Sequence, residues 1–513
     1  MCALALLTLR LALLPINTDL SQGFSHDSAY IAIVARNLMS GKGWVNDASW
    51  LVFLHPAHLP MPYHNANPLY PLLTALAARA CGVQIVTAGL LVSALANVLL
   101  MPAAFYLVTY WVRDTWTAFF LSLAVTVFPS LWEDSLRMLP DALHLALLIG
   151  GMGFFVRGGQ RMRCAAAGGA FLGAAWLTRS TASLIAPALL LYALAAWGWR
   201  KALTRLLLVG VTAALIATPW WIHSARVWGS PFRSDASYYA FQDLYARSYG
   251  GSVERYWHSP TPPPPPGQLL RTDGLGVLSH TAGGIPKVLR VWLRAGWEDT
   301  YVPRIVLVVL LAAVALALRR HLVTAPLVAS ALYGTLQIAA LALRADSMEP
   351  RYLAPFTALT VLWLGYGMAV LLAQWRLRRF TGYALILSCA FFGVYAPIQD
   401  ARLARQLSAQ DTAMASLRRI RRTISSTVTH QDPVIVADPY FYSYDTEAQA
   451  LSIPESSDAY LMRYMEQYHC RWVILTDAEL RFWKPAWAAQ LPSWLRVHAV
   501  IDGNTLFERV VAS

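Results

Sequence analysis

Long apolar segments alternate with short polar segments along most of the chain. A helix needs about 20 apolar residues to cross roughly 30 Å of hydrocarbon, and the pattern predicts about eleven such spans, of which several are short and would be tilted helices or half-helices. The predicted spans are residues 2–17, 86–112, 115–131, 139–156, 163–178, 181–199, 202–222, 304–318, 322–343, 352–374 and 380–397. The pattern therefore indicates an α-helical polytopic membrane protein.

The basic residues predict how these spans are oriented. Lys and Arg in short loops gather on the cytoplasmic side of a membrane. In this chain they occupy every second loop, at Arg113; Arg157, Arg161 and Arg163; Arg200, Lys201 and Arg205; Arg319 and Arg320; and Arg376, Arg378 and Arg379. This places the N-terminus in the cytoplasm and the C-terminus outside. Residues 69–80 are apolar but have to stay outside, so we expect a juxtamembrane helix there.

Most of the polar sequence then lies on the outer face. Residues 1–397 form the predicted transmembrane domain, with outer loops 18–85 and 223–303 and a short outer turn at 132–138. The aromatic residues of loop 223–303 suit a membrane interface or a sugar-stacking surface.

The composition changes after about residue 397, where strand-like and helix-like segments replace the long apolar runs. Residues 434–437, 472–475 and 506–510 resemble strands, and residues 460–468 resemble a helix. We therefore predict a small periplasmic or extracytoplasmic α/β domain at 398–513. It contains no phosphate loop or nucleophile motif, so we expect an accessory role, either binding an acceptor or covering the site.

The composition agrees with a membrane protein and narrows its partners. The chain is 57% hydrophobic and 13% charged, with a net charge of +13. In a membrane protein such an excess reflects orientation and contact with anionic lipids, so we expect membrane lipids and no nucleic acid as partners. The five cysteines, at 2, 81, 164, 389 and 470, show neither disulfide nor zinc spacing. The first segment has no clear cleavage site, which favours a retained helix, and its shortness leaves a start further upstream open.

A polar stretch after the first apolar segment contains the first candidate for chemistry. Ser25 is a plausible cap for a helix that starts at His26, which places Asp27 in its first turn. Backbone N–H groups and the helix dipole favour a carboxylate there, so Asp27 should stay ionised and able to accept a proton or bind a cation. An exposed capping acid is the alternative. His26 is a weaker candidate beside it.

A second group of acids lies at the outer edge of the span 139–156. Pro140 suits a first helical turn, which puts Asp141 at the start of that span, in the same environment as Asp27. Two such carboxylates could divide the work between deprotonating an acceptor and holding a cation. Capping is again the alternative, and Glu133 and Asp134 are weaker candidates.

Three arginines break the charge rule by lying on the predicted outer side: Arg137, Arg179 and Arg351. A guanidinium at an outer helix start can form a forked contact with phosphate. Arg351 is therefore a phosphate-ligand candidate, with an ordinary interfacial anchor as the alternative. These exceptions suggest an anion on this face.

Histidines at 55, 58 and 64 could bind a metal ion. Their spacings fall in a Pro-rich loop without a carboxylate partner, so surface histidines are the favoured interpretation. Asn67 and Pro68 then begin a turn that leads into the segment from Leu69.

Four short motifs together resemble the GT-C class of membrane glycosyltransferases. They are His26-Asp27-Ser28-Ala29-Tyr30 with Ala35-Arg36-Asn37-Leu38, Asn67-Pro68-Leu69-Tyr70, Pro140-Asp141-Ala142-Leu143 and Arg351-Tyr352-Leu353-Ala354-Pro355. The chain is similar to bacterial aminoarabinose and galacturonic acid transferases and to protein O-mannosyltransferases over about residues 10–370. The resemblance implies catalytic roles for Asp27 and Asp141.

The resemblance also implies a polyprenyl-phosphate-linked sugar as donor, with its lipid between helices and its phosphate on Arg351 and Arg179. The predicted substrate-binding residues are His26, Tyr30, Asn67, Tyr70, Arg137, Arg179, Arg351 and Tyr352. Aminoarabinose transferases carry Glu-Lys before the Pro-Leu-Tyr stretch, where this chain has Ala66-Asn67. No cofactor is assigned, and a divalent metal ion is left open.

We therefore predict a glycosyltransferase of the cytoplasmic (inner) membrane, acting on a lipid, glycan or protein hydroxyl at its outer face in the cell envelope. A transporter or lipid flippase, or a non-catalytic envelope assembly protein, are the alternatives. A transporter is disfavoured because the chain shows no inverted repeat. The sugar, the acceptor, the prenyl chain length and the oligomeric state are not predicted.

Overall fold

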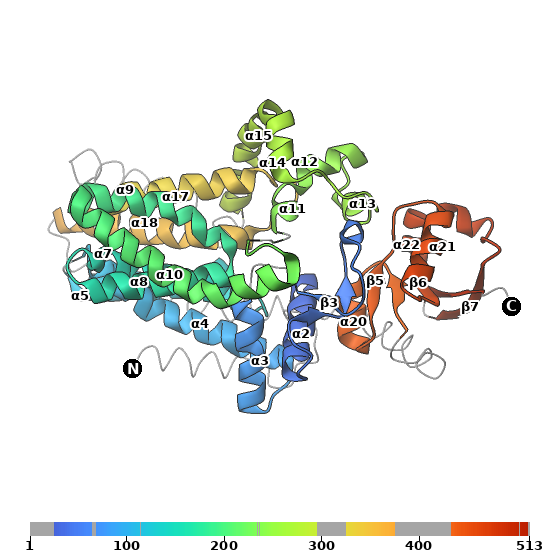
Figure 1. Ribbon diagram of the computed structural model, residues 1–513. Helices are drawn as coiled ribbons and strands as arrows, with labels where there is room; N and C mark the ends of the chain where they lie inside the picture. Colours follow the sequence, from blue (N-terminus) through green and yellow to red (C-terminus); the bar gives the residue numbers. More distant parts are fainter. Residues whose placement is uncertain are drawn as a thin grey trace.

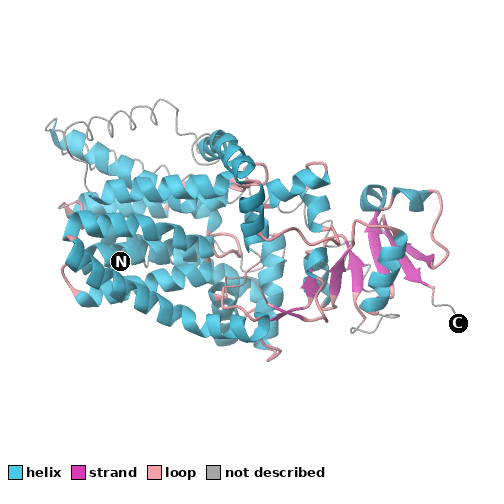
Figure 2. Ribbon diagram, turned by 45° about the horizontal axis from the view of Figure 1, so that its top comes forward, coloured by secondary structure: helices cyan, strands magenta, loops and turns pink. Residues whose placement is uncertain are grey.

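The computed structural model describes residues 25–63, 68–112, 114–232, 234, 236–294, 325–374, 432–501 and 503–510. Three predicted spans, 2–17, 304–318 and 380–397, lie outside the described residues. A bundle of helices forms one end of the molecule and a mixed sheet forms the other (Figures 1 and 2).

Helices dominate the described residues, as the apolar pattern predicts. The α-helices are α2 (His26–Met39), α3 (Leu69–Cys81), α4 (Ile85–Val108), α5 (Thr115–Thr126), α6 (Pro129–Asp134), α7 (Asp141–Gly158), α8 (Met162–Thr178), α9 (Ala186–Trp197), α10 (Trp199–Trp228), α11 (Ala236–Ala240), α12 (Gln242–Ala246), α13 (Val253–Trp257), α14 (Pro266–Thr272), α15 (Gly274–Leu293), α17 (Ala325–Ala342), α18 (Ala354–Gln374), α20 (Pro439–Thr446), α21 (Asp458–Gln467) and α22 (Asp477–Trp483). The 3-10 helices are η1 (Val52–Leu54), η2 (Ser180–Ile185), η3 (Arg247–Tyr249), η5 (Pro350–Leu353) and η6 (Pro485–Ala488).

Four described helical stretches are long and apolar enough to cross a membrane: α4, α7, η2 continued by α9, and α10. Shorter apolar helices are α3, α5 and the part of α17 from Val328. Each begins within a few residues of a predicted apolar segment. The described residues therefore support a membrane-spanning bundle, and the count of about eleven spans stays a prediction.

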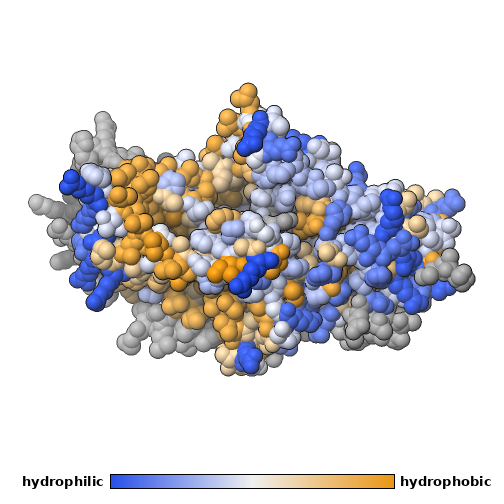
Figure 3. Space-filling view, viewed as in Figure 1, coloured by the Kyte–Doolittle hydropathy of each residue, from blue (hydrophilic) through white to orange (hydrophobic). Residues whose placement is uncertain are grey.

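The surface of the bundle is apolar where the long helices face outward. Leu203, Leu207 and Leu215 of α10 are each more than 60% exposed. Hydrophobic residues cover the side of the helical end shown in Figure 3, and hydrophilic residues cover much of the C-terminal end. Apolar surface of this extent is typical of contact with lipid.

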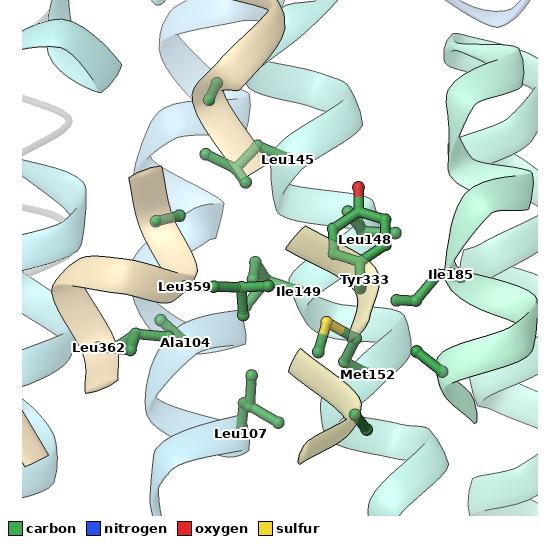
Figure 4. Packing of buried hydrophobic residues seen from close by; sticks show 14 of the residues in the cluster. Ala104, Leu107, Leu145, Leu148, Ile149, Met152, Ile185, Tyr333, Leu359 and Leu362 are labelled. Carbon is green, nitrogen blue, oxygen red and sulfur yellow. The ribbon is translucent and has the colours of Figure 1, made fainter. Parts of the chain in front are cut away.

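Helix α7 lies at the centre of the bundle and is the most buried of the four long stretches. Its residues Leu148 and Ile149 pack in one cluster with Leu107 of α4 and Leu359 of α18 (Figure 4). This cluster holds α7 from Leu145 onward, and Ala142 and Leu143 at the start of α7, next to Asp141, pack in a second cluster.

Helices α8 and α10 approach closely because α8 carries glycines at the contact. A Cβ atom at Gly173 would lie 2.7 Å from the carbonyl oxygen and 2.9 Å from the Cα of Ala213. We expect Gly173→Ala to destabilise the protein by about 1–3 kcal/mol, since backbone atoms have to move apart. Thermal unfolding of the purified protein in detergent measures this.

The matched control for that prediction is Gly210→Ala in α10, where an added Cβ meets nothing within 4 Å. Alanine is a better helix former than glycine, so this variant should melt at the same temperature as the parent or slightly above it. Equal melting temperatures for the two variants would contradict the packing argument.

The C-terminal region forms a small α/β unit around a mixed sheet, as predicted. The strands of the C-terminal region are β4 (Val434–Val436), β5 (Ala450–Ser452), β6 (Trp472–Thr476), β7 (Leu495–Ile501) and β8 (Asn504–Arg509). Three short strands lie in the segment after α2: β1 (Val45–Asn46), β2 (Ala48–Ser49) and β3 (Met61–Pro62). The larger sheet has six strands in the order β2-β5-β4-β6-β8-β7. Its first four strands pair in parallel, and β8 pairs antiparallel with both β6 and β7. The predicted strand and helix positions in this region are confirmed.

One strand of this sheet comes from the other end of the sequence. Strand β2 pairs with β5, with Ala48 opposite Ala450. Asp47, just before β2, accepts a hydrogen bond from Asn37 of α2 at 3.0 Å and forms an ion pair with Arg36 at 3.1 Å. The segment after α2 therefore joins the helical end to the C-terminal sheet.

Candidate active site

The start of α2 presents His26 and Asp27 at the junction between the two ends of the molecule. The side chain of Ser25 caps the helix by accepting from the backbone N–H of Ser28 at 3.3 Å. This cap, which the sequence predicts, sets both residues in the first turn. The Asp27 side chain is 49% exposed.

Helix α7 presents the second carboxylate. Asp141 is its first residue and is only 3% exposed. Arg179, between α8 and η2, places one terminal nitrogen 2.7 Å from Oδ1 and 2.9 Å from Oδ2 of Asp141. A buried charge needs such a partner, because an unpaired carboxylate would be strongly destabilising.

Arg351 joins the two carboxylates. It lies in η5, which precedes α18, and its side chain is 4% exposed. It donates a hydrogen bond to Asp27, and its Nη1 lies 4.0 Å from Oδ2 of Asp141. Its Nε lies 2.8 Å from Glu349. Nη1 is buried and makes no hydrogen bond to the described residues, so its donor capacity is unsatisfied.

These contacts set the charge state of Asp27. Burial by itself would raise the pKa of this carboxyl, but the charge of Arg351 and a contact with His26 outweigh it and lower the pKa below its usual range. Asp27 is therefore a carboxylate over the physiological pH range, and it is a weak base as long as Arg351 holds it.

A cavity of about 820 Å³ opens between the helices and the C-terminal region, and all three charged groups line it. A cavity of this size holds a small ligand or the polar part of a larger one. Among the predicted site residues, it is lined by His26, Asp27, Tyr30, Tyr70, Asp141, Arg179, Arg351 and Tyr352. Residues predicted from five separate segments thus meet in one place.

Other predicted residues lie elsewhere. Arg137 is not part of the cavity lining and pairs with Glu133 at 2.5 Å. Asp134 is buried outside the lining, and burial, followed by the charge of Asp141, raises its pKa well above the usual range. Asn67 and His64 lie outside the described residues.

Several lining residues were not predicted from the sequence. Arg344 follows the predicted span 322–343, and its position at a helix end was an available signal. The guanidinium carbons of Arg344, Arg179 and Arg351 lie 4.7, 5.0 and 5.1 Å from the ring centre of Tyr352. Three cations around one ring make this end of the cavity suited to an anion.

The C-terminal region also contributes to the lining, through Asp438 and Tyr440. Trp50, from the segment after α2, and Trp257, from α13, line the same side. Trp257 belongs to the aromatic residues of loop 223–303, for which a sugar-stacking surface is one of the two predictions, and no local sequence pattern singles out the other three. The ring of Trp50 packs against those of Trp257 and Tyr440, and we call this group the aromatic end of the cavity, in contrast to the arginine end.

A divalent metal ion does not fit the carboxylates of this site. Such ions need several oxygen ligands, and both Asp27 and Asp141 contact guanidinium groups instead. Within the described ranges, no group of three His, Cys, Asp or Glu side chains could hold a metal ion. His55 and His58 instead contact the carbonyl oxygens of Pro260 and Pro60, at 2.8 and 3.2 Å.

By sequence, the chain matches no family model and no curated protein. By structure it matches ArnT from Cupriavidus metallidurans bound to undecaprenyl phosphate, with a TM-score of 0.60 at 14% identity over 99% of this chain and 98% of that chain. The chain has the GT-C glycosyltransferase fold.

The same GT-C fold is seen in the oligosaccharyltransferase of Archaeoglobus fulgidus. Its complex with zinc and sulfate has a TM-score of 0.60 at 12% identity, covering 93% of this chain and 68% of that chain. The archaeal enzyme AglB in complex with an inhibitory peptide and a dolichol-phosphate has a TM-score of 0.55 at 12% identity, covering 92% and 69%. The resemblance that the short motifs predict is thus confirmed at the level of the fold.

Proposed function

We propose that this protein is a membrane glycosyltransferase that moves a sugar from a polyprenyl-phosphate donor to a hydroxyl group on a lipid, glycan or protein. The observation that carries the proposal is the buried Arg351, which contacts both Asp27 and Asp141 in one cavity. The GT-C fold supports it, since ArnT and AglB bind undecaprenyl phosphate and dolichol-phosphate, respectively.

The arginine end of the cavity would receive the donor phosphate. Nη1 of Arg351 has no hydrogen-bond partner among the described residues and would donate to the phosphate, and Arg179 and Arg344 add positive charge. Negative charge develops on the phosphate as the bond to the sugar breaks, so fixed guanidinium groups lower the barrier at that step. The apolar surface of the bundle would hold the prenyl chain.

Asp27 would activate the acceptor. A phosphate that binds Arg351 competes with Asp27 for the guanidinium, which raises the pKa of the carboxyl and makes it a better base. The acceptor hydroxyl then transfers its proton to Asp27 as its oxygen bonds to the anomeric carbon. The phosphate leaves with the electron pair of the broken bond. Asp141, held by Arg179, would orient the acceptor.

The charge pattern along the sequence indicates on which side of the membrane the cavity would open. Basic residues in alternate loops indicate that the N-terminus is cytoplasmic, so the cavity would open on the outer face of the cytoplasmic membrane. The C-terminal α/β region would then lie in the periplasm or outside the cell.

Comparison of envelope lipids and glycans with and without the protein tests the proposed function. We expect a product that carries an additional sugar only in cells that make the protein, together with release of undecaprenyl phosphate from its sugar-linked form. Mass spectrometry detects both. A transporter would change where a lipid-linked sugar accumulates but would leave acceptors unmodified. An unchanged envelope profile would contradict the proposal.

A further inference from the structure

A histidine lies between two carboxylates at the point where the C-terminal region meets the candidate active site. The Nδ1 atom of His26 is 4.0 Å from Oδ1 of Asp27. Its Nε2 atom is 3.8 Å from Oδ1 of Asp438. Asp438 follows strand β4 in the C-terminal region, so the two acids come from opposite ends of the sequence. The three groups all line the same cavity.

The position of Asp438 is fixed by its own helix. Its side chain caps α20 by accepting from the backbone N–H of Phe441 at 3.3 Å. Helix α20 lies against α2 in Figure 1, and Arg36 of α2 donates to the carbonyl oxygens of Ser443 and Tyr444 at 3.3 and 3.1 Å. The distance between Asp438 and His26 is therefore set by contacts on both sides.

Aromatic rings restrict the imidazole. The ring centre of Trp50 is 4.0 Å from that of His26, in an edge-on arrangement, and Tyr440 is 4.7 Å away. A ring enclosed in this way holds one orientation, with each nitrogen facing one carboxylate. Trp50 precedes η1 and Tyr440 lies in α20, so the enclosure exists only when the C-terminal region is docked.

The charged and titratable groups around His26 are Asp27, Glu349, Asp438 and, more distantly, His258. Burial lowers the pKa of His26, but Asp438 and then Asp27 and Glu349 more than offset it, so the pKa is raised. The imidazole is therefore positively charged over a wider pH range than in water.

From this geometry we propose that Asp438 is a positioning residue of the transfer reaction, which holds the charged His26 against Asp27 so that the C-terminal region completes the active site. This inference rests on the proposed function. When the donor phosphate draws Arg351 away from Asp27, His26 remains as the second cation beside that carboxylate. It keeps Asp27 oriented toward the acceptor.

A direct consequence is a pH dependence whose sign is fixed. Transfer requires protonated His26, so it is fully present below the pKa of His26 and is lost as the pH rises through that value. Asp438→Asn removes the largest interaction that favours the proton. The variant should therefore lose sugar transfer at a pH about one unit lower than the parent does, and its rate at pH 8 should be about tenfold lower.

The experiment uses the full chain in lipid nanodiscs. It is supplied with undecaprenyl-phosphate sugars and acceptor lipids extracted from the same cells, and release of undecaprenyl phosphate is followed from about pH 6 to about pH 9. Asp438→Glu keeps the charge and should restore most of the activity. Glu466→Gln is the matched control, since Glu466 is an exposed acid of α21 in the same region, and it should leave the pH profile unchanged.

A second measurement does not depend on turnover. Proton NMR of selectively labelled histidines, with His26 assigned from the His26→Gln variant, reports its titration in each protein. We expect a lower pKa for His26 in Asp438→Asn and an unchanged one in Glu466→Gln. An unchanged His26 titration in Asp438→Asn would overturn the inference. A loss of rate in Asp438→Asn that is equal at every pH, and that Asp438→Glu does not restore, would overturn it as well.

These outcomes separate the inference from the proposed function. If the envelope profile never changes with the protein, the proposed function fails, whatever the titration shows. If the parent protein transfers sugar and Asp438→Asn has the pH profile of the parent, only the role of Asp438 fails.

Discussion

Asp27→Asn is expected to reduce sugar transfer by about 10²–10⁴-fold, because the amide cannot take up the proton of the acceptor hydroxyl. The variant protein should still be made and inserted into the membrane. The Asp27 side chain is 49% exposed, so an amide of the same shape fits without a packing change. Arg351 keeps its contacts with Glu349 and Asp141 in this variant. Release of undecaprenyl phosphate by the purified variant, compared with its melting temperature, measures the effect.

The matched control for Asp27 is Glu133→Gln. Glu133 is also a partly exposed acid beside an arginine, but it lies outside the cavity lining. We expect this variant to retain the activity of the parent. If Asp27→Asn is as active as Glu133→Gln, Asp27 is not the base. If Asp27→Asn does not fold, Asp27→Glu supplies a second test, since it keeps the charge but moves the carboxylate by one methylene group.

Arg351→Lys is expected to weaken binding of undecaprenyl phosphate by about 10–100-fold and to slow transfer by at least that factor. A lysine keeps the positive charge but lacks the forked donors, so it cannot contact Asp27 and a phosphate together. Arg351 is buried between Asp27, Asp141 and Glu349. The ammonium group of lysine reaches less far, so part of the negative charge of these three carboxylates would be left unpaired. We therefore also expect a lower melting temperature.

Titration with undecaprenyl phosphate, followed by native mass spectrometry, measures the change in affinity. Arg137→Lys is the control, because Arg137 forms a partly exposed ion pair with Glu133 outside the cavity lining. Such pairs contribute about 0–1 kcal/mol, so affinity and stability should stay near those of the parent. Equal affinity in Arg351→Lys and the parent would contradict the assignment of Arg351 to the phosphate.

The two ends of the cavity suggest how one site could hold two substrates. Arg179, Arg344 and Arg351 surround Tyr352 at one end, and Trp50, Trp257 and Tyr440 lie at the other. Phosphate binds where guanidinium groups gather, and sugar rings pack well on aromatic faces. Asp27 contacts Arg351 at the arginine end and lies beside His26, whose ring packs on Trp50 and Tyr440 at the aromatic end. An acceptor hydroxyl beside Asp27 would therefore be close to both.

Local chemistry allowed the helices to be predicted. A segment such as 86–112 is apolar throughout, and the structure has α4 at Ile85–Val108. The cap formed by Ser25 and the first-turn position of Asp27 depend on residues within one helical turn, so the sequence contains all the information needed. The same holds for Asp141 after Pro140. Both carboxylates could therefore be named before any contact was known.

Their assembly into one site could not be predicted in this way. The contacts of Arg351 with Asp27 and Asp141 depend on how α2, α7 and η5 are placed by packing around the bundle core. Arg137 pairs with Glu133, four residues earlier, which is a local contact. Only the fold brings Arg179 to Asp141, 38 residues earlier in the chain.

The sequence by itself determined that the chain is mostly helical with a C-terminal α/β region, where the described apolar helices lie and which two carboxylates begin helices, because each depends on neighbouring residues. The tertiary structure alone decided that Ala48–Ser49 completes the C-terminal sheet and that Asp438 faces His26. A strand of two residues and a capping aspartate have no distinctive pattern of their own. Their roles arise from contacts between residues about 400 positions apart, and those contacts exist only after the chain has packed.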